Sequence, residues 1–314
     1  HLSDMHLRGV NEDSIIHQSY HFRRAMTLNW ASLAAAEKVH TSTDKRLVPI
    51  IYNLLKQYYL QLVAVRNGGS LGYQLREIYP GSNLVRSRSE TRKYFYYMGR
   101  RLLNQLAAIY SNGGTSDVES LAMVSVYTAD WQVLFGEYAE ALESYKNSYQ
   151  DLEKISAHQA ETMFRIPRVI PVSDFYTSMS EVVNIGTNIT SLEQEKNVDG
   201  PYKLVFLESE AGFPSLGQTT EFSMSDDMLS SRALLAFALP QSNAEIAEET
   251  DLGELLFGKP FDIEILDLDN SDLAQVEKFK TRVQDISFRP KLVEGLPRKS
   301  EILLEYKIFS KLKE

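Results

Sequence analysis

The chain has 314 residues, 43% of them hydrophobic, and a formal net charge of −9 with a sequence pI near 5.3. This length is sufficient for two domains with sizeable cores, and the acidic balance argues against nucleic acid as the main partner. The chain has no cysteine, which excludes disulfides and thiol chemistry and suits either a cytoplasm or a Gram-negative periplasm.

Residues 1–40 have the apolar composition of a helical segment and contain the first candidate for a metal site. His17 and His21 are four positions apart, which would place both imidazoles on one helix face. His6 and Glu12 lie in the same region, but neither is placed as a convincing third ligand. Two histidines on a polar helix face are usually only solvated, so we expect no metal ion and no cofactor.

Residues 45–66 have apolar side chains at helical spacing and end at a glycine-rich stop. The string Gly68–Gly72 fits G-x-S-x-G, the nucleophile elbow of α/β-hydrolases, with Ser70 as nucleophile. The elbow requires a strand before the serine, whereas a long amphipathic helix precedes Ser70, and His158 is the only histidine downstream. We therefore expect a helix terminus rather than an enzyme, and a serine hydrolase remains an alternative.

A basic cluster interleaved with aromatic residues occupies residues 86–101. Such a mixture can bind a nucleic-acid strand through phosphate contacts and stacking. However, Ser87-x-x-Glu90 is a capping box that predicts a helix continuing to about Tyr110, with its aromatic residues toward a core and its arginines on solvated edges. We expect no nucleic-acid partner. The basic residues are Arg86, Arg88, Arg92, Lys93, Arg100 and Arg101.

Residues 121–154 resemble a tetratricopeptide repeat, a pair of helices in which small side chains allow close approach. The resemblance implies that helices at 45–66 and 92–110 are degenerate neighbouring repeats. An irregular helical bundle is the alternative. The residues that carry the resemblance, and that would pack the repeat, are Ala129, Gly136, Tyr138, Ala141, Tyr145 and Ser148.

A connector is predicted at residues 165–200, where Pro167 and Pro171 prevent a continuous helix. It separates a helical domain at 1–164 from an α+β domain at 201–314, and we expect it to be cut readily by proteases. Asn188-Ile189-Thr190 matches a glycosylation acceptor, a short pattern that is common by chance.

The C-terminal part has the pattern of strands around one helix. Alternation predicts strands at 202–207, 232–239, 261–267 and 302–309, and helical spacing predicts a helix at 272–286 that Ser271 or Asp272 can cap. The acidic string Asp267–Asn270 is similar to the start of a calcium loop. The glycine and the glutamate that the loop requires are replaced by Asp272 and Lys278, so we expect no calcium site.

This part of the chain, from about residue 230 to 309, resembles the C-terminal domain of TonB, the periplasmic energy transducer. The resembling segments are Phe288-Arg289-Pro290 after the helix, Gly295-x-Pro297, and the alternating strand Leu304-x-Tyr306-x-Ile308. The resemblance implies the envelope of a Gram-negative bacterium, with a signal or anchor removed before His1. It also implies that one edge of the small sheet binds a strand of a partner protein.

We expect that edge to belong to the closing strand, because little of the chain follows it. Alternation would place Leu304, Tyr306 and Ile308 toward the core. The residues predicted to bind the partner are Leu303, Leu304, Glu305, Tyr306, Lys307 and Ile308.

The sequence thus predicts an α+β protein with no catalytic residues, a periplasmic adaptor for protein partners that is accessory to outer-membrane transport. Any membrane association would come from a segment absent from this chain. A cytoplasmic repeat scaffold is the other alternative.

Overall fold

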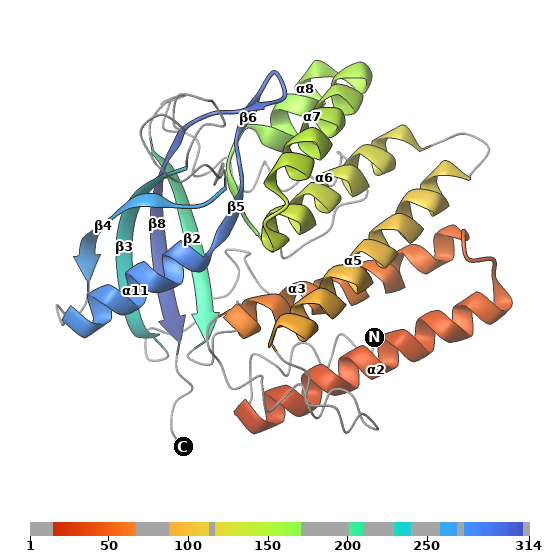
Figure 1. Ribbon diagram of the computed structural model, residues 1–314, viewed down its shortest axis with the longest axis horizontal. Coiled ribbons are helices and arrows are strands. Elements are labelled where there is room, and N and C mark those ends of the chain that lie inside the picture. The colour runs from red at the N-terminus through yellow and green to blue at the C-terminus, as the bar shows by residue number, and fades with distance from the viewer. Residues whose placement is uncertain are drawn as a thin grey trace. The chain divides into compact units, whose positions relative to one another are not determined.

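The structure is a computed structural model, and its helices and strands are shown in Figure 1. It describes residues 15–66, 88–112, 117–170, 201–209, 229–239, 258–268 and 273–309. The described part is a mixture of helices and small sheets, which confirms the α+β class.

The chain divides into two compact units that are each built from separate stretches of sequence. One unit holds residues 1–112, 205–232 and 306–314, and the other holds residues 113–204 and 233–305. The second unit thus combines helices from the middle of the chain with C-terminal strands. The domain boundaries expected from the sequence, at 164 and 201, group these elements differently and remain a prediction for limited proteolysis to test.

The first unit contains three long helices, α2 (Ile15–Val39), α3 (Val48–Arg66) and α5 (Arg88–Ser111), and the short 3-10 helix η1 (Lys45–Leu47). Helix α3 packs against both α2 and α5 (Figure 1). The predicted helix at 45–66 and the predicted helix that ends near Tyr110 are therefore confirmed.

The core of this helical group follows the apolar spacing of the sequence. Helix α3 buries Leu54, Leu55 and Tyr58, and helix α5 buries Phe95 and Leu102. Burial of each such side chain stabilises the helices by roughly 1.5–3 kcal/mol, more than intrinsic helix propensity supplies.

The second unit contains the helical hairpin α6 (Val118–Phe135) and α7 (Tyr138–Ile155), followed by α8 (Ala157–Phe164). The Asp117 side chain caps α6 by accepting from the backbone N–H of Ser120 at 3.1 Å. Gly136 ends α6 in the left-handed conformation, with φ 83°, as glycine does at many helix C-termini. A helical hairpin with its turn at Gly136 is thus confirmed.

Residues expected to pack the tetratricopeptide-like pair lie at this hairpin. Ala129, Ala141, Tyr145 and Ser148 are buried, and Tyr138 is half-buried. This burial fits two helices in close contact, and membership of a repeat array remains a prediction.

An Ala141→Arg variant is expected to unfold more readily than the parent protein. Ala141 is 0% exposed, so the arginine must either be buried without a partner or separate the helices. Overpacking costs about 1–3 kcal/mol and an unpaired buried charge adds to it. Ala139→Arg, at an exposed position of the same helix, should change stability by less than about 0.5 kcal/mol. Equal thermal unfolding of the two variants would contradict the close helix contact.

The largest described sheet has the strand order β2-β8-β3-β4. Its strands are β2 (Tyr202–Ser209), β3 (Leu229–Leu239), β4 (Phe261–Leu268) and β8 (Ser300–Phe309). Helix α11 (Leu273–Asp285) packs against β4 (Figure 1). All four predicted strands and the predicted helix are present, each within a few residues of the expected bounds.

Two small antiparallel pairs complete the second unit. Strand β1 (Arg168–Ile170) pairs with β5 (Ser287–Arg289), and β6 (Leu292–Val293) pairs with β7 (Leu296–Pro297). Glu294 and Gly295 join β6 to β7 with φ of 54° and 76°, as in the two-residue turns that suit hairpins. The Gly295-x-Pro297 segment of the sequence thus forms the turn and the second strand of this hairpin.

Candidate functional site

Strand β8 does not have the free edge that its place near the end of the sequence suggested. Its neighbours in the sheet are β2 on one side and β3 on the other, so both of its edges are hydrogen-bonded within the chain. The prediction that residues 303–308 bind a partner strand is therefore wrong. The physical reason is that position in the sequence does not fix position in a sheet.

The alternation predicted for β8 is nevertheless confirmed. Leu304, Tyr306 and Ile308 are buried, whereas Leu303, Glu305 and Lys307 are only partly covered. The rings of Tyr306 and Phe206 meet edge to face, with centroids 5.1 Å apart. These side chains build the core of the sheet and are not available to a partner. The residues predicted to bind a partner, all in β8, are Leu303, Leu304, Glu305, Tyr306, Lys307 and Ile308.

The two ends of the described sheet are β2 and β4, and β4 is an irregular edge. The pairing of β4 with β3 is irregular at two places. Along β3, these register shifts lie between Leu234 and Leu235 and between Ala236 and Ala238. Asp262 adopts φ 52°, in the left-handed region that a non-glycine residue rarely occupies. Bulges and charged side chains on an edge strand hinder the addition of another strand.

Strand β2 forms the opposite end and is held by contacts at two of its residues. Phe206 is buried against Tyr306. The hydroxyl of Tyr202 accepts a hydrogen bond from Nζ of Lys291 at 2.8 Å, and the same ammonium group lies 5.5 Å from the ring centroid. Both contacts fix the strand through its side chains. They leave the backbone groups of its outer edge directed away from β8.

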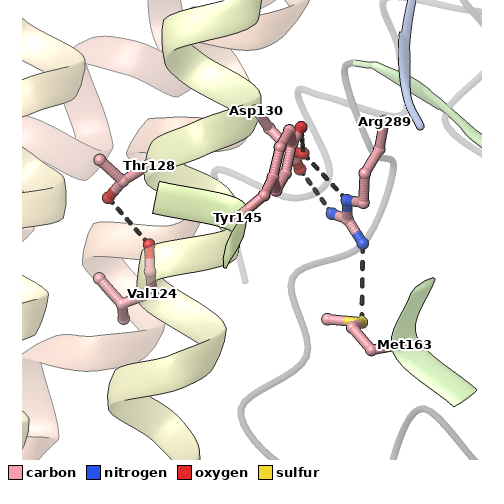
Figure 2. Close-up of polar contacts among 6 residues, drawn as sticks. All are labelled: Val124, Thr128, Asp130, Tyr145, Met163 and Arg289. Carbon is pink, nitrogen blue, oxygen red and sulfur yellow. Dashed lines mark hydrogen bonds and ion pairs between the residues drawn. The ribbon is translucent and has the colours of Figure 1, made fainter. Parts of the chain in front are cut away.

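A buried ion pair is the most unusual polar feature of the second unit. Asp130 of α6 and Arg289 of β5 are 0% and 1% exposed, and they pair in a bidentate manner. Nε of Arg289 donates to Oδ1 of Asp130 at 2.9 Å, and Nη2 donates to Oδ2. Figure 2 shows the guanidinium pointing at the carboxylate, with Tyr145 beside it.

Two further side chains complete this polar cluster. The hydroxyl of Tyr145 on α7 donates to Oδ1 of Asp130 at 2.6 Å. Nη1 of Arg289 lies 3.6 Å from Sδ of Met163 on α8, which is a weak acceptor. The cluster thus joins helices α6, α7 and α8 to strand β5.

Burial alone would disfavour the charged form of Arg289. The negative charge of Asp130 and its hydrogen bonds outweigh that effect and raise the pKa of Arg289 above its ordinary value. The guanidinium therefore stays charged, and it requires its carboxylate partner for that reason.

The cluster has the features of a structural contact. Its side chains are almost fully buried, and the charged groups pair with each other. Replacing one residue of such a pair by a neutral one leaves the other charge buried without a partner. The arrangement therefore fixes how α6 sits against β5 within this unit.

Several candidate sites from the sequence lie outside the described residues. These are the Ser70 elbow, Ser87 of the capping box, the connector from residue 171 to 200 with Asn188, and the acidic string from Asp269 to Asp272. Helix α2 includes His17 and His21, whose side chains are likewise outside the described part.

The described residues show neither a metal-ligand cluster nor a membrane-spanning helix. Among them, no three histidine, aspartate or glutamate side chains are grouped closely enough to hold a metal ion. None of the helices in the described ranges is both long and apolar enough to span a membrane.

Comparison of the chain with protein-family models, curated proteins and solved structures finds no match in any of the three.

Proposed function

We propose that the chain is a non-enzymatic adaptor that binds an extended segment of a partner protein along the outer edge of β2. The observation that carries this proposal is the strand order β2-β8-β3-β4. Among the described strands, β2 is paired on one side only. An unpaired edge offers a row of backbone donors and acceptors that another chain can use to add a strand.

Strand β2 has the same length as β4 and is favoured because the edge of β4 is irregular. It runs for 8 residues, from Tyr202 to Ser209, and alternate residues of an edge strand direct their N–H and C=O groups outward. The two register shifts of β4 interrupt the even spacing that a partner strand would need. A partner would thus find a less favourable edge on β4 than a strand without these shifts offers.

The setting of this adaptor is also a proposal. The resemblance of residues 230–309 to the TonB C-terminal domain supports a periplasmic protein that assists outer-membrane transport. The resemblance also supports strand addition as the mode of binding, with β2 rather than β8 as the strand that binds the partner. A fusion of the native full-length gene to alkaline phosphatase, which is active only after export, would test the location.

A pair of proline variants tests the edge directly. The N–H groups of Leu204 and Val205 point to opposite sides of β2, because neighbouring residues of a strand alternate. Proline removes that donor. One variant should keep its thermal stability and lose at least about tenfold in partner capture, and the other should unfold because it breaks the pairing with β8.

The measurement is photo-crosslinking in the native host, with benzoylphenylalanine at Lys203, followed by mass spectrometry of the adduct. Leu204→Ala and Val205→Ala are the matched controls, since each shortens the side chain but keeps the N–H. Capture that survives both proline substitutions would refute binding along β2.

The hydrolase alternative is tested separately. Labelling of the full chain by a fluorophosphonate probe, lost on Ser70→Ala, would replace the adaptor with an enzyme.

A further inference from the structure

Helix α5 differs in charge from the acidic chain that contains it. Between Arg88 and Ser111 it carries five basic residues and a single acidic one, Glu90, whereas the whole chain has a net charge of −9. No acidic residue occurs from Thr91 to Ser111. The helix therefore concentrates positive charge on one element.

Part of this charge forms a stripe on the face opposite the core. Lys93, Tyr97 and Arg101 follow one another at intervals of four residues, which brings them to one side of a helix, and all three are exposed. Tyr96 and Arg100 lie beside them, half-buried. We call these five residues the α5 stripe.

Contacts among its side chains hold the stripe together. The rings of Tyr96 and Tyr97 meet edge to face, with centroids 5.4 Å apart. The guanidinium of Arg100 lies 5.8 Å from the Tyr96 ring centroid, and its Nη1 is 3.5 Å from the Tyr96 hydroxyl. Tyr97 remains 66% exposed, an unusual position for so large a ring.

From this arrangement we propose that the α5 stripe binds the headgroups of an anionic lipid surface. Cations near such a surface are attracted to it, and a tyrosine ring is stable at the level of the headgroups because it has an apolar body and a polar tip. The stripe is a line of side chains on a convex helix. A flat layer of headgroups can meet such a line without a groove.

The acidic remainder of the chain does not prevent this contact. At physiological ionic strength the field of a charge decays over about 8 Å, so the surface interacts mainly with the charges nearest to it. Those on the outer face of α5 are Lys93, Arg100 and Arg101.

A nucleic-acid strand fits the stripe less well. Proteins that grip single strands offer successive aromatic faces for the bases. Of the two tyrosine rings in the stripe, only that of Tyr97 is largely exposed, because Arg100 lies over the ring of Tyr96.

The test is co-sedimentation of the full chain with lipid vesicles. One set contains phosphatidylcholine alone, and in the other a third of it is replaced by phosphatidylglycerol. We expect binding to the anionic set only, weakened by added salt. The double variant Lys93→Gln/Arg101→Gln should reduce it about 25-fold, since each cation contributes about fivefold.

A matched control separates the stripe from net charge. Lys278→Gln/Arg298→Gln removes two exposed cations from other elements and should bind like the parent. Equal loss in both double variants would overturn the assignment to α5. Failure of the parent to bind anionic vesicles, with binding instead to an oligo-dT strand or a poly-glutamate peptide, would overturn the lipid surface as the ligand. Thermal unfolding of each variant confirms that it is folded.

Discussion

An Asp130→Asn variant is expected to lose about 3–5 kcal/mol of unfolding free energy. The substitution leaves the guanidinium of Arg289 buried without a countercharge, and the energy of an isolated charge in a protein interior is high. It also weakens the hydrogen bond from the hydroxyl of Tyr145, which donates to Oδ1 of Asp130 at 2.6 Å. Urea denaturation followed by circular dichroism measures the loss.

Two further variants serve as controls for Asp130→Asn. Asp151→Asn breaks an exposed ion pair with Lys154, whose side chain is 72% exposed, and should cost less than about 1 kcal/mol. The double variant Asp130→Leu/Arg289→Met replaces both buried charges by apolar groups, and it should be more stable than Asp130→Asn alone. Equal costs for Asp130→Asn and Asp151→Asn would contradict the buried pair.

A Gly258→Ala variant is expected to be destabilised by about 2–4 kcal/mol. Gly258 has φ 77°, and a Cβ there would lie 2.3 Å from the carbonyl oxygen of Phe288. That backbone cannot yield easily, because the N–H of Phe288 donates to the Gly258 carbonyl at 2.7 Å. The left-handed conformation contributes about 1–2 kcal/mol and the overlap about 1–3 kcal/mol.

Gly136 supplies the matched control for this variant. It has a similar φ of 83°, but a Cβ there would meet no atom within 4 Å. Gly136→Ala should therefore show the conformational cost alone, about 1–2 kcal/mol. If the two alanine variants unfold at the same urea concentration, the close approach of Gly258 to Phe288 is not a constraint on the fold.

The helices and strands could be predicted from the sequence because each has its own local spacing of apolar residues. The alternation in β8 identified Leu304, Tyr306 and Ile308 as buried side chains. The same period cannot say which strands lie beside β8, since an interior and an edge strand can both alternate. The order of the strands in the sheet depends on contacts between distant segments of the chain. The prediction of a free edge on β8 was wrong because the sequence does not show these contacts.

The buried ion pair was missed for a related reason. Its two members are separated by 159 positions, so no local spacing connects them. A partial signal was present, because Asp130 is an acidic residue in the middle of a largely apolar helix, and a buried carboxylate requires a partner. In the sequence Arg289 stands out only as part of the Phe288-Arg289-Pro290 string. Nothing in the sequence selects it over the other arginines.

Hydrogen exchange at the amides of β2, resolved by NMR, tests strand addition most directly. The full chain would be compared with its complex with the partner segment that photo-crosslinking identifies. If β2 binds a partner strand, alternate amides between Tyr202 and Ser209 should exchange fast in the free protein and slowly in the complex, because each gains an acceptor on the partner. Unchanged exchange along β2, with protection appearing instead at other residues, would contradict it.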